Sequence, residues 1–133
     1  MELRTAQGNT WVFAREPALP AAEEEWVACV MASASASPFA FAEAATHASL
    51  AASCRLIVIA APNAEEVHDH IHWIVEEREA LDTVTTFHCG PEALEDAVAL
   101  IEPSLTPPGQ VHVFSDDPDR VESQVRSMGL VAD

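Results

Sequence analysis

The sequence contains no lysine, and all six of its cationic residues are arginines. Twenty-two acidic residues give the chain a formal net charge of −16 at pH 7. Sequence-independent binding to nucleic acid needs a basic surface that contacts phosphates, so we exclude this class of function. The same imbalance disfavours binding to anionic membrane surfaces and repels anionic small molecules. The charge instead favours a cationic partner.

Glycine, cysteine and long apolar runs are also scarce. With only four glycines and neither G-x-G-x-x-G nor G-x-x-x-x-G-K-[ST], we expect no dinucleotide and no other cofactor. The cysteines Cys29, Cys54 and Cys89 form no C-x-x-C pair, and Cys29 lies in an apolar run, where we expect it buried. No apolar run reaches the roughly 18 residues of a membrane helix, and residues 1–10 lack the apolar part of a signal peptide. We therefore expect a cytoplasmic protein.

Strand-like and helix-like segments alternate along what we predict to be one domain, residues 1–133. Apolar or β-branched runs predict five strands at Thr10–Ala14, Trp26–Met31, Arg55–Ala61, Thr83–His88 and Val111–Phe114. Capping residues, prolines and glycines predict four helices at Pro38–Ser53, Ala64–Ala80, Pro91–Ile101 and Pro118–Met128. Among these signals, Ser37, Asn63 and Asp117 cap helix starts, whereas Pro103 and Gly129 end helices.

Alternation of this kind predicts an α/β fold. We expect a three-layer sandwich, Rossmann-like or flavodoxin-like, with a mostly parallel sheet of about five strands and helices on both faces. Thr10–Ala14 is predicted to be an antiparallel edge strand. The chemistry of response-regulator receivers is excluded because it needs a lysine.

One candidate site follows from the expected strand ends. In an open parallel sheet, ligands bind beyond the carboxyl ends of the strands. His88, Cys89 and Asp116 follow two of these ends and could supply a base, a nucleophile and a carboxylate to a small enzyme or ligand-binding domain. The alternative is purely structural, with Asp117 as a helix cap and Gly90 as a turn residue. We therefore assign no catalytic residue, and an enzyme is the less favoured interpretation.

The segment Val67–His72 carries a second candidate site. His68 and His72 are four residues apart on a predicted helix, a spacing that can share a metal ion, and Glu65 or Asp69 could add a third ligand. The motif H-E-x-x-H does not occur. The alternative that we favour is a solvated acidic face without metal, opposite an apolar stripe of Val67, Ile71, Ile74 and Val75.

Trp73 lies on the flank of the same helix, where an exposed indole beside acidic groups suits a protein interface. His70 lies near this boundary. Trp26 is expected in the core, and His112 is expected to be a core or half-buried residue and not a ligand. The acidic segments available to a partner are Glu23–Glu25, Glu65–Glu79 and Asp116–Asp119. The residues predicted to bind that partner are Glu65, Asp69, His72, Trp73, Glu76, Asp116 and Asp117.

Two short stretches carry a resemblance. Val67-His68-Asp69 followed by Trp73, and Thr85-Thr86-Phe87-His88 followed by an acidic helix, are similar to small bacterial α/β domains, over residues 55–128. That resemblance implies a fold and no activity. By type, a small acidic domain resembles the immunity proteins and antitoxins that neutralise bacterial toxins, which implies a basic toxin as the bound partner. A structural homodimer is the remaining alternative.

Overall fold

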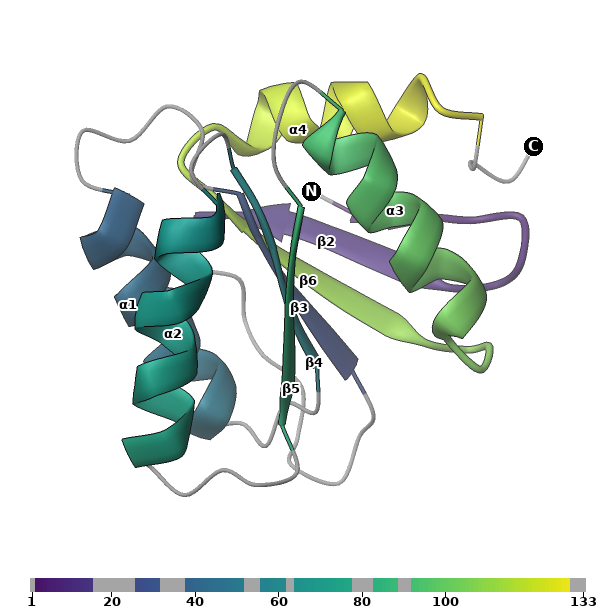
Figure 1. Cartoon of the computed structure of the whole chain (residues 1–133). Helices are drawn as coiled ribbons and strands as arrows, with labels where there is room; N and C mark the ends of the chain where they lie inside the picture. The colour runs from purple at the N-terminus through teal and green to yellow at the C-terminus, as the bar shows by residue number, and fades with distance from the viewer. Residues whose placement is uncertain are drawn as a thin grey trace.

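The computed structural model of the chain describes residues 2–15, 26–31, 38–51, 56–61, 64–77, 83–88 and 92–129. It shows an α/β fold with four helices and a six-stranded mixed sheet (Figure 1). Several residues named above lie outside the described ranges: Glu23–Glu25, Ser37, Cys54, Arg55, Asn63, Glu79, Cys89, Gly90 and Pro91.

The sheet has the strand order β1-β2-β6-β3-β4-β5. Its strands are β1 (Glu2–Arg4), β2 (Thr10–Ala14), β3 (Trp26–Met31), β4 (Leu56–Ala60), β5 (Val84–His88) and β6 (Gln110–Ser115). The prediction of five strands was wrong because it omitted β1. This strand has three residues and a single buried side chain, Leu3, which is too short a pattern to distinguish from a terminal coil.

The predicted place of β2 was also wrong. β2 pairs in parallel with β6 and antiparallel with β1, so it lies inside the sheet, and β1 is the antiparallel edge strand. Trp11 and Phe13 are completely buried, as the alternation of β2 indicates. Alternation identifies the buried face of a strand, but it carries no information about which strands are its neighbours.

The helices are α1 (Pro38–Ala51), α2 (Ala64–Glu77), α3 (Ala93–Ser104) and α4 (Pro118–Arg126). None of these described helices combines the length and the apolar character that crossing a membrane requires. At the start of α4, the side chain of Asp117 accepts a hydrogen bond from the Arg120 backbone N–H at 3.4 Å, so the predicted cap is confirmed. Gly129 follows α4 with φ +78°, a left-handed conformation that favours glycine and confirms the predicted stop.

Pro103 was predicted to end α3, and this prediction was wrong because the helix continues to Ser104. Proline in the last turn removes one backbone hydrogen bond without blocking the turns before it. The Ser104 hydroxyl donates to the Ile101 carbonyl at 2.7 Å, and the Leu105 N–H donates to the Glu102 carbonyl at 3.4 Å. These two bonds engage carbonyls that would otherwise lack partners at the end of the helix.

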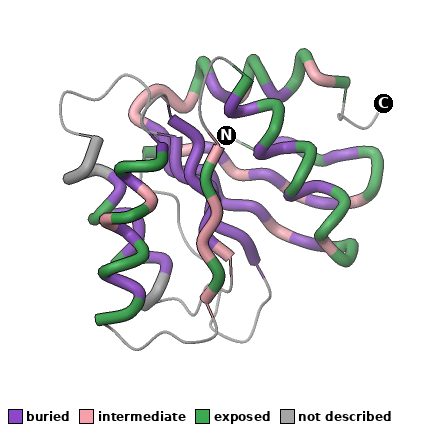
Figure 2. The backbone as a smooth tube through the Cα atoms, viewed as in Figure 1, coloured by how far each residue is buried: buried purple, intermediate pink, exposed green. Residues whose placement is uncertain are grey.

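Both faces of the sheet carry helices (Figure 1). The reason is that the chain adds successive strands first in one direction across the sheet and then in the opposite direction. The chain steps from β3 to β4 to β5 through α1 and α2, and then returns from β5 to β6 through α3. Right-handed crossovers in opposite directions place their helices on opposite faces. Two buried clusters result, one that includes Trp11, Phe13 and Ile101, and one that includes Trp26, Ile57 and Ile71. Figure 2 shows this pattern, with buried central strands and exposed outer helix surfaces.

Several predicted core residues are confirmed. Trp26 is buried and meets the ring of His112 edge-on at a centroid distance of 5.3 Å. His112 is also buried, and its Nε2 lies 3.1 Å from the side-chain oxygen of Gln110. Cys29 is buried in β3, and desolvation raises the pKa of its thiol to about 12. Cys29 is therefore a small apolar core residue and no nucleophile.

Candidate functional site

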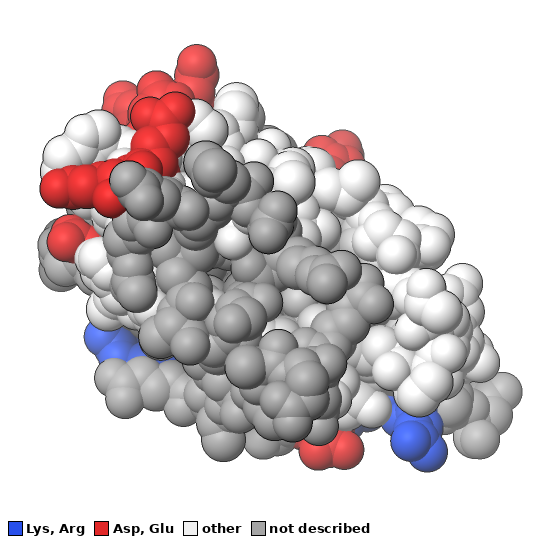
Figure 3. Space-filling view, turned by 90° about the horizontal axis from the view of Figure 1, so that it is seen from below, with Lys and Arg blue, Asp and Glu red and all other residues white. Residues whose placement is uncertain are grey.

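The exposed side of α2 carries most of the residues that the sequence predicted to bind a partner. Val67, Ile71, Ile74 and Val75 are buried toward the sheet, so the predicted apolar stripe is confirmed. The helix contains five acidic residues and no arginine. We define the α2 acidic face as its exposed residues: Glu65, Glu66, Asp69, His72, Trp73, Glu76 and Glu77. In Figure 3, acidic side chains gather in one corner, on the side of the molecule where α2 lies.

Trp73 is the large apolar side chain of this face and is 58% exposed. Helical spacing places Asp69 one turn before it and Glu77 one turn after it, so carboxylates flank the indole along the helix. Exposed tryptophan is uncommon, because burying an indole is strongly favourable. The combination of an exposed indole with adjacent carboxylates is suited to a partner that brings both apolar and cationic groups.

His68 occupies the junction between α2 and the edge strand β5. Its Nε2 lies 2.9 Å from the Thr85 hydroxyl, and its ring centroid lies 4.9 Å from that of Phe87. The sequence placed His68 on the solvated side of the helix, and this was wrong, because the side chain is only 18% exposed. Helical periodicity predicts where a side chain lies around the helix axis. It does not predict that β5 lies beside α2 and buries the side chains on that flank.

The predicted metal pair lies together. The His68 and His72 rings stack with centroids 5.9 Å apart and an interplanar angle of 17°. Each Nε2 already has a protein neighbour, Thr85 for His68 and the Glu76 carboxylate, at 3.0 Å, for His72. Over the described ranges, no group of three or more His, Cys, Asp or Glu side chains is placed to hold a metal ion.

His70 points to the other flank of α2. Its Nε2 lies 3.3 Å from the Glu43 carboxylate, and the same carboxylate lies 3.8 Å from His47 Nε2. His70 therefore links α2 to α1 and lies apart from the α2 acidic face. This contact joins the partly exposed surfaces of the two neighbouring helices.

The structure separates the predicted strand-end residues. Ser115, Met31, Ala60 and His88 lie in register across four neighbouring strands. Three strand spacings of roughly 4.8 Å put the backbones of Ser115 and His88 about 14 Å apart, so Asp116 lies far from His88. Asp116 and Asp117 follow β6 at this edge and do not belong to α2, and the Asp117 side chain caps α4.

One buried carboxylate was missed by the sequence analysis. Glu102 on α3 is only 3% exposed, and its Oε1 accepts hydrogen bonds of 2.8 Å from the Thr5 hydroxyl and from Asn9 Nδ2. Asn9 Oδ1 in turn accepts a 2.8 Å bond from the Gly109 N–H. A signal was present in the sequence, because Glu102 is four residues after Val98 and so continues the buried stripe of α3.

Compared with known proteins, the chain matches no protein-family model and no curated protein. What the chain does is therefore inferred from its own residues and their geometry. The α2 acidic face is the described surface where predicted partner-binding residues come together, five of them on one helix: Glu65, Asp69, His72, Trp73 and Glu76.

Proposed function

We propose that this chain is a protein-binding module that uses the α2 acidic face to bind a basic protein. The observation that carries this proposal is Trp73, 58% exposed on a helix that has five acidic residues and no arginine. A tryptophan in such a place gains the most free energy when a partner covers it. The carboxylates beside it select a partner whose covering surface is cationic.

Charge and indole have different roles in this proposal. Each exposed ion pair contributes only about 0.2–1 kcal/mol, whereas a buried tryptophan hot spot contributes about 2 kcal/mol or more. The acidic groups therefore mainly accelerate association by electrostatic steering. Trp73 mainly sets how slowly the complex dissociates, and an arginine of the partner can stack on its face.

Within this class, the narrower proposal is an immunity-type or antitoxin-type inhibitor that neutralises a bacterial toxin in the cytoplasm. Its support is the net charge of −16. A toxin that acts on nucleic acid carries a basic surface, and an acidic inhibitor is complementary to that surface. The finer architecture is likewise a proposal. Helices on both faces and a reversal of strand order between β3 and β6 support a three-layer, Rossmann-like or flavodoxin-like sandwich.

The test uses two variants with the same change in net charge. The α2 variant carries Glu65→Gln, Asp69→Asn and Glu76→Gln, and the control variant carries Glu2→Gln, Glu92→Gln and Asp96→Asn, all at exposed positions. Proteins are captured from the native host at low salt on the wild type and on both variants. We expect a basic protein that the wild type and the control variant retain and the α2 variant loses.

The captured protein is then purified and titrated with Trp73→Ala. We expect at least a tenfold weaker affinity, corresponding to roughly 1.4 kcal/mol. Equal affinity of the α2 and control variants would overturn the proposal of a binding face on α2. If the complex forms but the partner keeps its toxic activity, the narrower inhibitor proposal fails and the binding module stands.

A structural homodimer is the second candidate, and the edge strand β5 favours it. Val84 is 59% exposed and Phe87 is 38% exposed, and β5 has no lysine, arginine or proline to discourage pairing with another strand. Sedimentation analysis tests this candidate with the double variant Val84→Lys and Phe87→Lys. A control for adding lysine at an exposed apolar position is Leu100→Lys on α3, which adds one lysine where the β5 variant adds two. A dimer lost only in the β5 variant would support it, and a monomeric wild type would eliminate it.

A further inference from the structure

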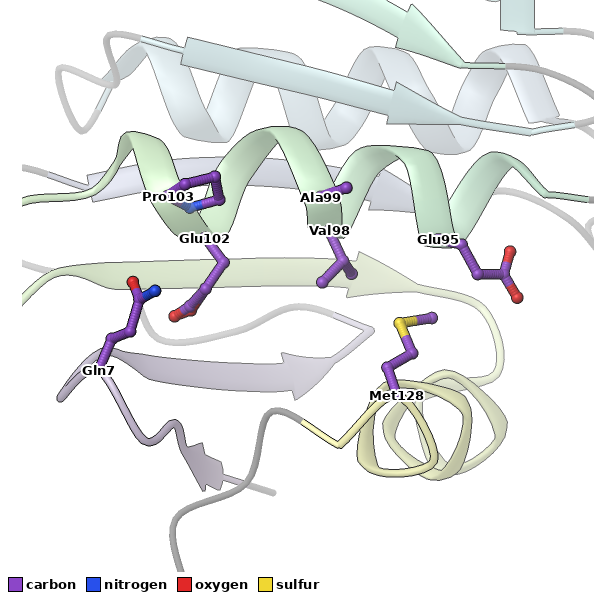
Figure 4. Close-up of a pocket in the computed structure, with 7 residues that line it drawn as sticks. All are labelled: Gln7, Glu95, Val98, Ala99, Glu102, Pro103 and Met128. Carbon is purple, nitrogen blue, oxygen red and sulfur yellow. The ribbon is translucent and has the colours of Figure 1, made fainter.

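A pocket of about 390 Å³ lies between α3, the turn that joins β1 to β2, and the end of α4 (Figure 4). It is on the α3 side of the sheet, whereas the α2 acidic face is on the other side (Figure 1). Its apolar wall includes Val98, Ala99 and Met128. Polar side chains stand at both ends, Glu102 and Gln7 at one and Glu95 at the other.

Glu102 is the side chain that marks the pocket as a binding site. Its structural contacts use a single oxygen, because the Thr5 hydroxyl and Asn9 Nδ2 both donate to Oε1. Oε2 is buried and has no hydrogen-bond donor among the described residues. A buried carboxylate oxygen without a donor is costly, and a donor supplied by a ligand would remove that cost.

The distance between the two carboxylates of the pocket limits the length of a ligand that could reach both. Glu95 and Glu102 are seven residues apart on α3, which corresponds to about 10 Å along the helix. Val98 and Ala99 lie between them on the same helix, and Met128 faces them from the end of α4 (Figure 4). The pocket therefore presents an acid, an apolar stretch and a second acid in a row.

We propose that this pocket binds a linear aliphatic diamine. One ammonium group donates to Glu102 Oε2 and to the side-chain oxygen of Gln7, and the methylene chain packs on Val98 and Met128. The second ammonium pairs with Glu95, which is exposed and therefore contributes less. The net charge of −16 raises the concentration of such cations around the protein.

The test titrates the full chain with hexamethylenediamine at physiological ionic strength, by calorimetry and by the NMR signal of the Met128 methyl group. Hexylamine and hexanediol serve as probes with one and no ammonium group. We expect the diamine to bind more tightly than hexylamine and hexanediol to bind least. Glu102→Gln should weaken diamine binding roughly 10- to 100-fold, the effect of losing a hydrogen bond to a charged group.

Glu92→Gln is the matched control, because this exposed residue precedes α3 and does not line the pocket. It should weaken diamine binding far less than Glu102→Gln does, and so should the α2 variant, because these substitutions change only the overall charge of the protein and not the pocket. If Glu102→Gln does not fold, Ala99→Leu provides the second test, because it fills the pocket from an exposed position and leaves the contacts of Glu102 in place. Equal binding of diamine and diol, an unmoved Met128 signal, or unchanged binding in Ala99→Leu would overturn the proposal.

Discussion

Replacing Glu102 by alanine tests whether this buried carboxylate holds the β1–β2 turn against α3. The Thr5 and Asn9 side chains are buried, and both donate to Glu102 Oε1 at 2.8 Å. Glu102→Ala removes the acceptor and leaves two buried donors without a partner. Each such donor costs about 1–3 kcal/mol. Removing a buried charge offsets part of this cost, so we expect the free energy of unfolding to fall by about 3 kcal/mol.

The assay is urea-induced unfolding followed by circular dichroism, with the slope compared between variants to confirm the same transition. Glu102→Gln keeps an acceptor oxygen in place, so we expect it to cost about 1 kcal/mol. Glu95→Ala, at an exposed position of the same helix, should change stability by less than about 0.5 kcal/mol. A loss below about 1 kcal/mol for Glu102→Ala would refute the view that this network stabilises the fold.

Three further outcomes follow from buried groups and caps. Burial raises the Cys29 pKa to about 12, so its thiol stays protonated near pH 8. We therefore expect Cys29 to react with a thiol reagent only after the protein unfolds, as followed by peptide mass spectrometry. Gly109→Ala should lower the free energy of unfolding by about 1–3 kcal/mol in urea titrations, because its Cβ would lie 3.0 Å from both Asn9 Oδ1 and Leu105 Cβ. Asp117→Ala should cost about 1 kcal/mol through loss of the α4 cap, measured by thermal unfolding, and an unchanged midpoint would contradict that role.

The helices were largely predictable from local signals. The apolar stripe of α2 and the capping signals of α4 each specify a helix within a few residues, because periodicity and capping are local properties. Pro103 misled the prediction of the end of α3, since proline in a last turn is tolerated when hydroxyl and backbone groups nearby engage the carbonyls.

Sheet order was not predictable in the same way. Trp11 and Phe13 show which face of β2 is buried, but the parallel pairing of β2 with β6 brings together residues about a hundred positions apart. Such pairing depends on the tertiary packing of the whole sheet, and the sequence of a strand does not indicate which strands are its neighbours. The missed strand β1 is held by its antiparallel pairing with β2 and by the turn to which Glu102 hydrogen-bonds.

The candidate site residues also differ in whether their surroundings could be predicted from a single helix or required the order of the strands. The exposure of Trp73 followed from its angle on α2, whereas the half-burial of His68 required knowing that Thr85 and Phe87 of β5 lie beside it. His88 and Asp116 were grouped because both follow strands, and strand order separates them. Helical periodicity thus predicted the buried stripe of α2, whereas the contacts of His68 and the separation of His88 from Asp116 depend on the order of the strands.

The most direct test of the α2 acidic face compares its charge with equal charge elsewhere. Calorimetry at low ionic strength measures the affinity of lysozyme, used as a basic probe protein, for the wild type, the α2 variant and the control variant. We predict that neutralising Glu65, Asp69 and Glu76 weakens binding several-fold more than neutralising Glu2, Glu92 and Asp96. Equal losses in the two variants would show that the probe senses only total charge, and would contradict a focused binding face on α2.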